Sequence, residues 1–232
     1  MYPDRECVNH HGTRVASRIA YGYVPDGKES EIITPLCRLI DCNVFHEGLR
    51  ETEMISVVEE IVLRYHSVCK VYNLCINFPG NEGRVSNLSE KIDQLQSEFD
   101  VLFVISTGNY MEYIHSQTIE DVLKDDALRL RSPAQSVNAL SVGAAAPVKR
   151  NGCISNVDQV VPYSLHGPGI SGTVKPELLA YSANVDYFEG NGIYIFNSKT
   201  IALDDGKPIN VAGTSFSAPI VSSYLARVWT VL

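Results

Sequence analysis

The segment GTSFSAP at residues 213–219 carries a serine at a position where a nucleophile could act. It follows an extended stretch and opens a helical pattern, and Gly213 permits the tight turn between them. Ser215 would then lie at a helix N-terminus, where unpaired N–H groups and the helix dipole favour developing negative charge. Pro219 fits the first helical turn because its missing donor costs little there. Taken alone, a serine in this place is more often a plain N-cap than a nucleophile.

A histidine at the start of another predicted helix could supply the general base. The segment HHGTRVA at residues 10–16 places His11 directly before the Gly-Thr step that begins this helix, with His10 as a rival. An imidazole can take and return a proton near neutral pH, which a serine nucleophile requires. A lone histidine is more often structural or simply exposed.

An asparagine after the most apolar stretch of the chain could stabilise an oxyanion. Asn109 ends the run Ser-Thr-Gly-Asn that follows residues 101–106, VLFVIS. Ligands of open parallel sheets bind outside the carboxyl ends of the strands, and an asparagine amide there can donate to an oxyanion. Alone, it would be an ordinary turn residue after a glycine.

The elements that must position these residues alternate between helical and extended patterns, without internal repeats. Such alternation predicts one α/β domain over residues 1–232, with a mostly parallel sheet and helices on both faces. The periodicity predicts helices at 12–21, 53–65, 88–99 and 217–231, and strands at 35–40, 68–76, 101–106 and 139–142. Residues 155–210 read as irregular, with short extended pieces such as 193–196. The acidic insertion 110–131 reads as a solvated surface excursion.

Composition excludes two function classes. The 232 residues are 45% hydrophobic and 20% charged, as in a globular protein with a sizeable core. Lys and Arg total 19 against 27 Asp and Glu, a net charge of −8, so the chain is a poor partner for nucleic acid. No stretch approaches the roughly 18 apolar residues that span a bilayer, so no membrane partner is expected.

The six cysteines form no CxxC pair. Cys69 and Cys75 lie six apart in one predicted strand, too far apart to bridge easily. Free buried thiols in a reducing compartment fit this pattern, and the N-terminus lacks the apolar run of a signal peptide, so we expect a cytoplasmic protein. A secreted disulfide protein, or a mature fragment of one, stays the alternative.

Taken together, the three motifs resemble the subtilase family of serine peptidases. The family's histidine motif is matched at His11-Gly12-Thr13, its oxyanion asparagine at Gly108-Asn109 and its serine motif at Gly213-Thr214-Ser215, in the family's order. The resemblance covers nearly the whole chain and implies a subtilisin-like fold. An α/β-hydrolase does not fit, because that fold places its serine before its histidine and within Gly-x-Ser-x-Gly.

The resemblance implies a serine endopeptidase that hydrolyses peptide bonds of a peptide or protein substrate through an acyl-enzyme. Ser215 would be the nucleophile, His11 the base, and Asn109 an oxyanion donor. The family's specificity strand is matched near residues 71–76, which implies substrate binding by Asn73, Cys75, Ile76 and Asn77. Asn77 replaces the usual glycine and should narrow the space beside it. The resemblance implies that no cofactor is needed. Calcium is common in the family, but the sequence contains no recognisable metal site or calcium-binding loop.

One departure from the family concerns the triad aspartate. It usually lies on a first strand about 30 or more residues before the histidine, whereas only ten residues precede His11. Asp4 and Asp41 stand in the wrong places, so we expect that no carboxylate of this chain hydrogen-bonds His11 Nδ1. We also expect Ser215 Oγ within roughly 3–4 Å of a His11 ring nitrogen.

The chain also ends in the helix that follows Ser215, where family members usually continue with further helices. The resemblance therefore predicts a domain truncated at both ends, whose partner would be the missing N-terminal segment. The alternative function is a non-catalytic fragment or pseudo-peptidase that binds peptides without cleaving them.

Overall fold

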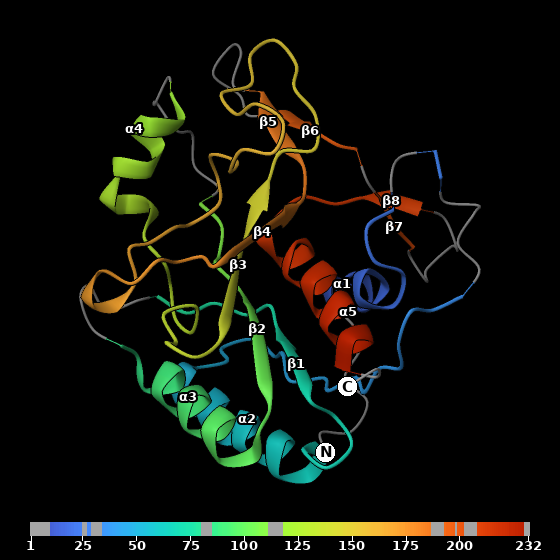
Figure 1. The fold of residues 1–232 in the computed structure, drawn as a ribbon, viewed down its shortest axis with the longest axis vertical. Helices are drawn as coiled ribbons and strands as arrows, with labels where there is room; N and C mark the ends of the chain where they lie inside the picture. Colours follow the sequence, from blue (N-terminus) through green and yellow to red (C-terminus); the bar gives the residue numbers. More distant parts are fainter. Residues whose placement is uncertain are drawn as a thin grey trace.

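A four-stranded parallel sheet forms the centre of the molecule (Figure 1). The computed structural model describes residues 10–24, 27–28, 34–79, 85–110, 118–186, 193–197, 199–201 and 208–229. The strands lie in the order β1 (Val71–Leu74), β2 (Leu102–Ser106), β3 (Leu140–Ala145) and β4 (Leu178–Tyr181). Their carboxyl ends therefore lie at one edge of the sheet, where the sequence places its candidate polar residues.

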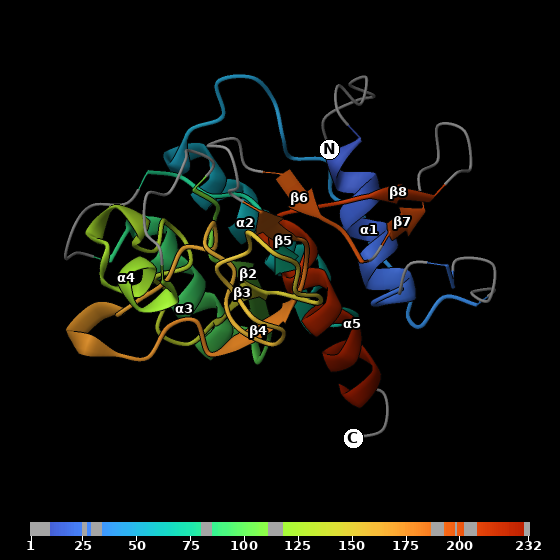
Figure 2. The ribbon, with the colours of Figure 1, turned by 90° about the horizontal axis from the view of Figure 1, so that it is seen from above.

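Helices cover both faces of this sheet, which confirms the predicted α/β class (Figure 2). On one face lie α2 (Glu51–Tyr65) and α3 (Asn87–Phe99), which share the largest apolar core with β1 and β2. On the other face lies α5 (Ala218–Trp229), and α1 (His11–Tyr21) packs against α5. A sheet covered on both faces explains why β2 is almost continuously apolar.

Most predicted helices and strands are present, with ends shifted by a few residues. The helix prediction for residues 12–21 corresponds to α1, and that for residues 217–231 to α5. The region 155–210 contains more order than predicted, because β4 belongs to the central sheet. Two small antiparallel pairs, β5 (Asn184–Asp186) with β6 (Ile193–Ile195) and β7 (Lys199–Ile201) with β8 (Pro208–Asn210), also lie there.

The strand predicted at residues 35–40 is wrong. This segment has no strand assignment, and Leu36, Leu39 and Ile40 are exposed. It runs beside the end of α1 instead, where the Leu36 N–H donates to the Ala20 carbonyl at 2.6 Å. Among the residues that the structure describes, β1 lies at the edge of the central sheet, and the segment 35–40 does not pair with it.

The acidic insertion is anchored rather than fully solvated. Its described part contains α4 (Ile119–Lys124) and a short 3-10 turn at Asp126–Leu128, and its acidic side chains are exposed as expected. However, Ile119, Val122 and Leu128 are buried and form a small core cluster with Leu165. The prediction was therefore right for the charged side chains and incomplete for the apolar ones.

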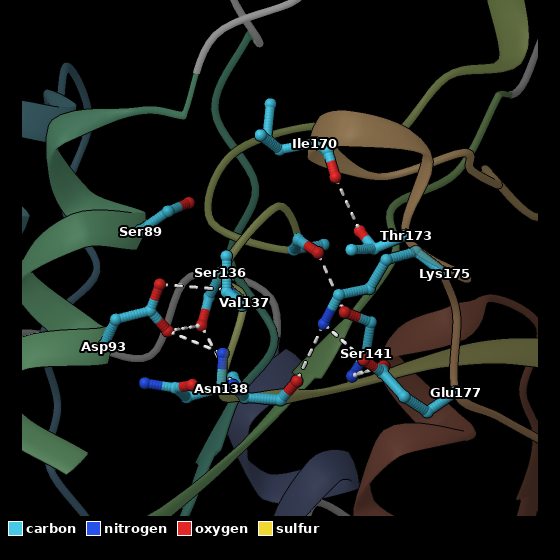
Figure 3. A network of polar contacts seen from close by, with 12 residues as sticks. Ser89, Asp93, Ser136, Val137, Asn138, Ser141, Ile170, Thr173, Lys175 and Glu177 are labelled. Carbon is cyan, nitrogen blue, oxygen red and sulfur yellow. Dashed lines mark hydrogen bonds and ion pairs between the residues drawn. The ribbon is translucent and has the colours of Figure 1, made fainter. Parts of the chain in front are cut away.

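Asp93 of α3 fixes the segment that leads into β3 (Figure 3). Its carboxylate accepts hydrogen bonds from Ser136 Oγ at 2.5 Å and from the backbone N–H groups of Val137 and Asn138 at 2.9 and 2.8 Å. Three donors on one carboxylate replace the hydration that this turn would otherwise need. The helix layer and the sheet are thus joined by directed bonds as well as by apolar packing.

A buried lysine joins the starts of β3 and β4 in the same view (Figure 3). Lys175 Nζ donates to the Ala139 carbonyl at 2.9 Å and lies 2.5 Å from Glu177 Oε1. The other carboxylate oxygen of Glu177 accepts from the Ser141 N–H at 2.8 Å. The buried ammonium is therefore paired, as a charge away from water requires.

The five cysteines in the described part of the chain, namely Cys37, Cys42, Cys69, Cys75 and Cys153, are free thiols. The prediction of free thiols is confirmed for these five, but only Cys153 is buried and the other four are partly exposed. Cys7 lies outside the described residues. No helix in the described ranges has the length and apolarity to cross a membrane.

Candidate active site

Ser215 lies in a single 3-10 turn, Thr214–Phe216, that joins Gly213 to α5. The sequence pattern placed it directly at a helix N-terminus; instead this turn precedes the helix, which begins at Ala218. Gly213 has φ 125° and ψ 153°, a conformation essentially confined to glycine. Ser215 is 7% exposed, so it is largely shielded from bulk water.

Two side chains from other elements hold the backbone of this turn. Cys75 Sγ donates to the Ser215 carbonyl at 3.4 Å. Ser182 Oγ accepts from the Gly213 N–H at 3.0 Å and lies 3.1 Å from the Gly213 carbonyl, to which it donates. Burial raises the pKa of the Cys75 thiol to about 12, so it remains a neutral donor. The turn is therefore fixed from the β1 side and from the end of β4.

Thr214 connects the serine turn to the loop after β2. Its hydroxyl accepts from the Gly108 N–H at 3.2 Å, and its own N–H donates to Asn109 Oδ1 at 2.8 Å. The second bond fixes the orientation of the Asn109 amide. Neither Asn109 Nδ2 nor the Ser215 N–H has a hydrogen-bond partner in the contacts described for these residues. Two donors beside the Ser215 turn are thus left for a ligand oxygen.

His11 approaches the serine turn from α1. Its ring centroid lies 5.4 Å from that of Phe216, the residue after Ser215. Val15, one turn further along α1, packs with Val211 and Phe216. Burial lowers the pKa of His11, and the nearby Arg14 cation lowers it further. The neutral imidazole, which can accept a proton, is therefore favoured at neutral pH.

The predicted close approach of Ser215 Oγ to a His11 ring nitrogen is not among the contacts described. The contacts described for Ser215 do not include a hydrogen bond from its hydroxyl to the His11 ring, and the two are brought together through Phe216. Asp41 is exposed and has no described contact with His11. Asp4 lies outside the described residues, so the expectation about His11 Nδ1 stays a prediction.

The four residues predicted to bind substrate divide between three surroundings. Asn73 and Cys75 both face α5. Asn73 Oδ1 accepts from Ser222 Oγ at 3.0 Å and its Nδ2 donates to Cys75 Sγ at 3.2 Å, while Cys75 packs against the cluster that contains Ala218. Ile76 packs on the opposite face, in the core shared with α2 and α3. Asn77 lies at the carboxyl ends of β1 and β2, where Nδ2 donates to the Ser106 carbonyl at 2.9 Å.

Two residues that the sequence did not single out prove important for the geometry. Thr214 lies inside the serine motif, and it contributes its backbone N–H to Asn109 and its hydroxyl to the Gly108 N–H. Ser182 gave no signal, because a serine after an extended piece is common and its bond to Gly213 spans 31 positions. No cluster of three or more metal-ligating side chains occurs among the residues that the structure describes.

Comparison with known proteins adds family information to this geometry. Residues 2–232 match the model of the Subtilase family. The uncharacterized protein y4bN of Sinorhizobium fredii is 26% identical in an alignment of 200 residues that covers 76% of this chain and 43% of y4bN. The chain therefore spans less than half of that relative.

Solved structures show the same fold at low identity. The prenylagaramide maturation protease PagA has a TM-score of 0.59 at 21% identity, over 98% of this chain and 67% of its own. The PatG macrocyclase in complex with peptide gives 0.61 at 18%, over 96% and 53%. A cold-adapted subtilisin-like serine proteinase gives 0.54 at 19%, over 95% and 61%. These likenesses confirm the subtilisin-like fold, and because the family model matches residues 2–232, the chain belongs to the subtilase family.

Proposed function

We propose that this chain is a serine endopeptidase that hydrolyses peptide bonds through an acyl-enzyme on Ser215. The observation that carries the proposal is the bond from the Thr214 N–H to Asn109 Oδ1 at 2.8 Å. This bond orients the amide so that Asn109 Nδ2 and the Ser215 N–H remain available to one oxyanion. Donors that are already oriented need no reorganisation when negative charge develops, which is the main source of stabilisation in acyl transfer.

In the first half-reaction Ser215 Oγ attacks the scissile carbonyl carbon while its proton passes to His11. The carbonyl oxygen becomes an oxyanion, bound by Asn109 Nδ2 and the Ser215 N–H. Return of the proton from His11 to the leaving nitrogen breaks the C–N bond and releases the amine. Water then attacks the ester by the same route, and the acid is released while Ser215 regains its proton.

Peptides as the substrate class are supported by the relatives. PagA is named a maturation protease, and PatG has been solved in complex with a peptide. The pKa of His11, lowered by burial and by Arg14, suits a base that must be neutral before it can act. The chemistry described uses protein groups alone, so we propose that no cofactor takes part.

The test is labelling of the chain with a small alkyl fluorophosphonate, followed by identification of the modified residue by mass spectrometry. We expect the phosphonyl group on Ser215 and no labelling of Ser215→Ala. The matched control is Ser217→Ala, since this buried serine lies two positions away and should not be needed for labelling. Absence of labelling in the folded parent chain would contradict the proposal and favour a protein that only binds peptides.

A further inference from the structure

Asn77 closes the space between the carboxyl ends of two neighbouring strands of the central sheet, β1 and β2. It lies three residues after β1 ends at Leu74, and its Nδ2 donates to the carbonyl of Ser106, the last residue of β2, at 2.9 Å. The Ser106 hydroxyl is 3.4 Å from Asn77 Oδ1. The amide therefore uses both its donor and its acceptor on the neighbouring strand.

The side chain of Asn77 also lies directly against Gly108. A Cβ atom built on Gly108 would lie 3.4 Å from both Cγ and Oδ1 of Asn77 and 2.9 Å from Leu165 Cδ1. The backbone beside Asn77 is held as well, because the Phe78 N–H donates to the Ser132 carbonyl at 2.8 Å. Ser106 is fully buried. Space between the strand ends is thus occupied by a side chain that is fixed at its tip and at its backbone.

A bound substrate would bring one of its side chains to this place. For reaction, the scissile carbonyl carbon must be within reach of Ser215 Oγ with its oxygen at Asn109 Nδ2. The Cα atom on the acyl side is about 1.5 Å from that carbon, so its side chain starts beside Gly108 and Asn109. The crevice outside the strand ends is where such a group would go, and Asn77 fills it.

We infer that Asn77 is a specificity-determining residue that restricts the acyl-side residue of the cleaved bond to small side chains, such as those of Gly, Ala and Ser. The inference rests on the proposed function of the same site. Exclusion is steric, and it is reinforced because displacing the Asn77 amide would leave the buried Ser106 carbonyl without its donor.

The test measures binding of acetylated tripeptides with a free C-terminal carboxylate, which mimic the acyl product. The peptides differ only in the last residue, Ala or Phe, and bind to the full chain in a calorimetric or fluorescence-anisotropy titration. For the parent chain we expect the Ala peptide to bind at least about tenfold more tightly than the Phe peptide. In Asn77→Gly this ratio should fall to about one or invert. Asn77→Ala provides a second opening variant if the glycine variant does not fold.

Asn77→Leu is the matched control, because leucine occupies similar volume without the amide. It should keep the preference for Ala if exclusion is steric. An unchanged ratio in both opening variants, or a parent chain that prefers Phe or binds neither peptide, would overturn the inference. Fluorophosphonate labelling of the parent chain reports separately on the proposed function, since that probe carries no acyl-side residue.

Discussion

The contacts described on the serine side and on the histidine side of the site differ in kind. Directed hydrogen bonds fix the serine turn, from Cys75, Ser182 and the Thr214 pair with Gly108 and Asn109. Ring contact with Phe216 and apolar packing of α1 position His11 in the contacts described. Hydrogen bonds have narrow distance and angle limits, whereas apolar packing is non-directional. Loss of one of these hydrogen bonds should therefore affect catalysis sharply, whereas loss of apolar packing around α1 should mainly lower stability.

The largest effect in this comparison is expected from Asn109→Asp. The aspartate keeps an oxygen for the Thr214 N–H but replaces the Nδ2 donor with a second anionic oxygen. Loss of one oxyanion donor lowers kcat by about 10²–10³, a magnitude known from a subtilisin-type enzyme. The added negative charge would repel the oxyanion, so we expect a loss at least this large. Steady-state hydrolysis of a peptide substrate would show the loss in kcat with little change in KM. A kcat equal to that of the parent chain would show that Asn109 does not stabilise the oxyanion.

Two glycine substitutions compare the sides directly. In Gly213→Ala the new Cβ would lie 3.3 Å from Asn109 Nδ2, at a φ of 125°. We expect a loss of about 1–3 kcal/mol in the free energy of unfolding, together with slower fluorophosphonate labelling. Gly12→Ala in α1 meets no atom within 4 Å and should raise stability by about 0.5–1 kcal/mol. Urea unfolding of both variants measures these changes. Equal changes in the free energy of unfolding for the two variants would contradict this comparison of the serine side with α1.

The smallest effect should come from Arg14→Gln, which removes the cation that helps to lower the pKa of His11. The acid limb of the labelling rate should move up toward pH 6.5, because a less acidic solution then suffices to protonate His11. Stability depends on pH in the same direction. Because the pKa of His11 is lower in the folded chain, the unfolded chain binds more protons, and the parent chain loses stability as the pH falls through 6.5 and below. Arg64→Gln on α2 serves as control, and identical acid limbs in parent and Arg14→Gln would contradict the assignment.

Local pattern was enough to predict the parts of the fold that carry a strong period. The helices α2 and α3 have apolar residues at helical spacing, and β2 is an apolar run, so the sequence predicts the correct type of secondary structure for each. The strand predicted at residues 35–40 is wrong because a short apolar run shows only a local preference, whereas a strand also requires pairing with a neighbour, which this segment does not make. Conversely, β4 was missed because Leu178 and Leu179 are exposed and its ladder partner β3 lies more than 30 positions earlier.

At the site, the sequence could identify side chains but could not establish their contacts. Ser215 and Asn109 could be singled out from their motifs. The bond that orients Asn109 joins residues 105 positions apart, so it depends on the finished sheet. The sequence also placed Asn73 and Asn77 in one predicted binding group. The structure separates them, because Asn73 faces α5 and Asn77 spans the ends of β1 and β2.

The most direct measurement is detection of the acyl-enzyme itself. The chain would be mixed with an activated ester of a peptide ending in alanine, quenched with acid within the first turnover and analysed by peptide mass spectrometry. We expect an acyl group on Ser215, absent in Ser215→Ala and depleted in Asn109→Asp. Turnover of the ester by the parent chain with no acyl group on Ser215, or with the group on another residue, would contradict this expectation.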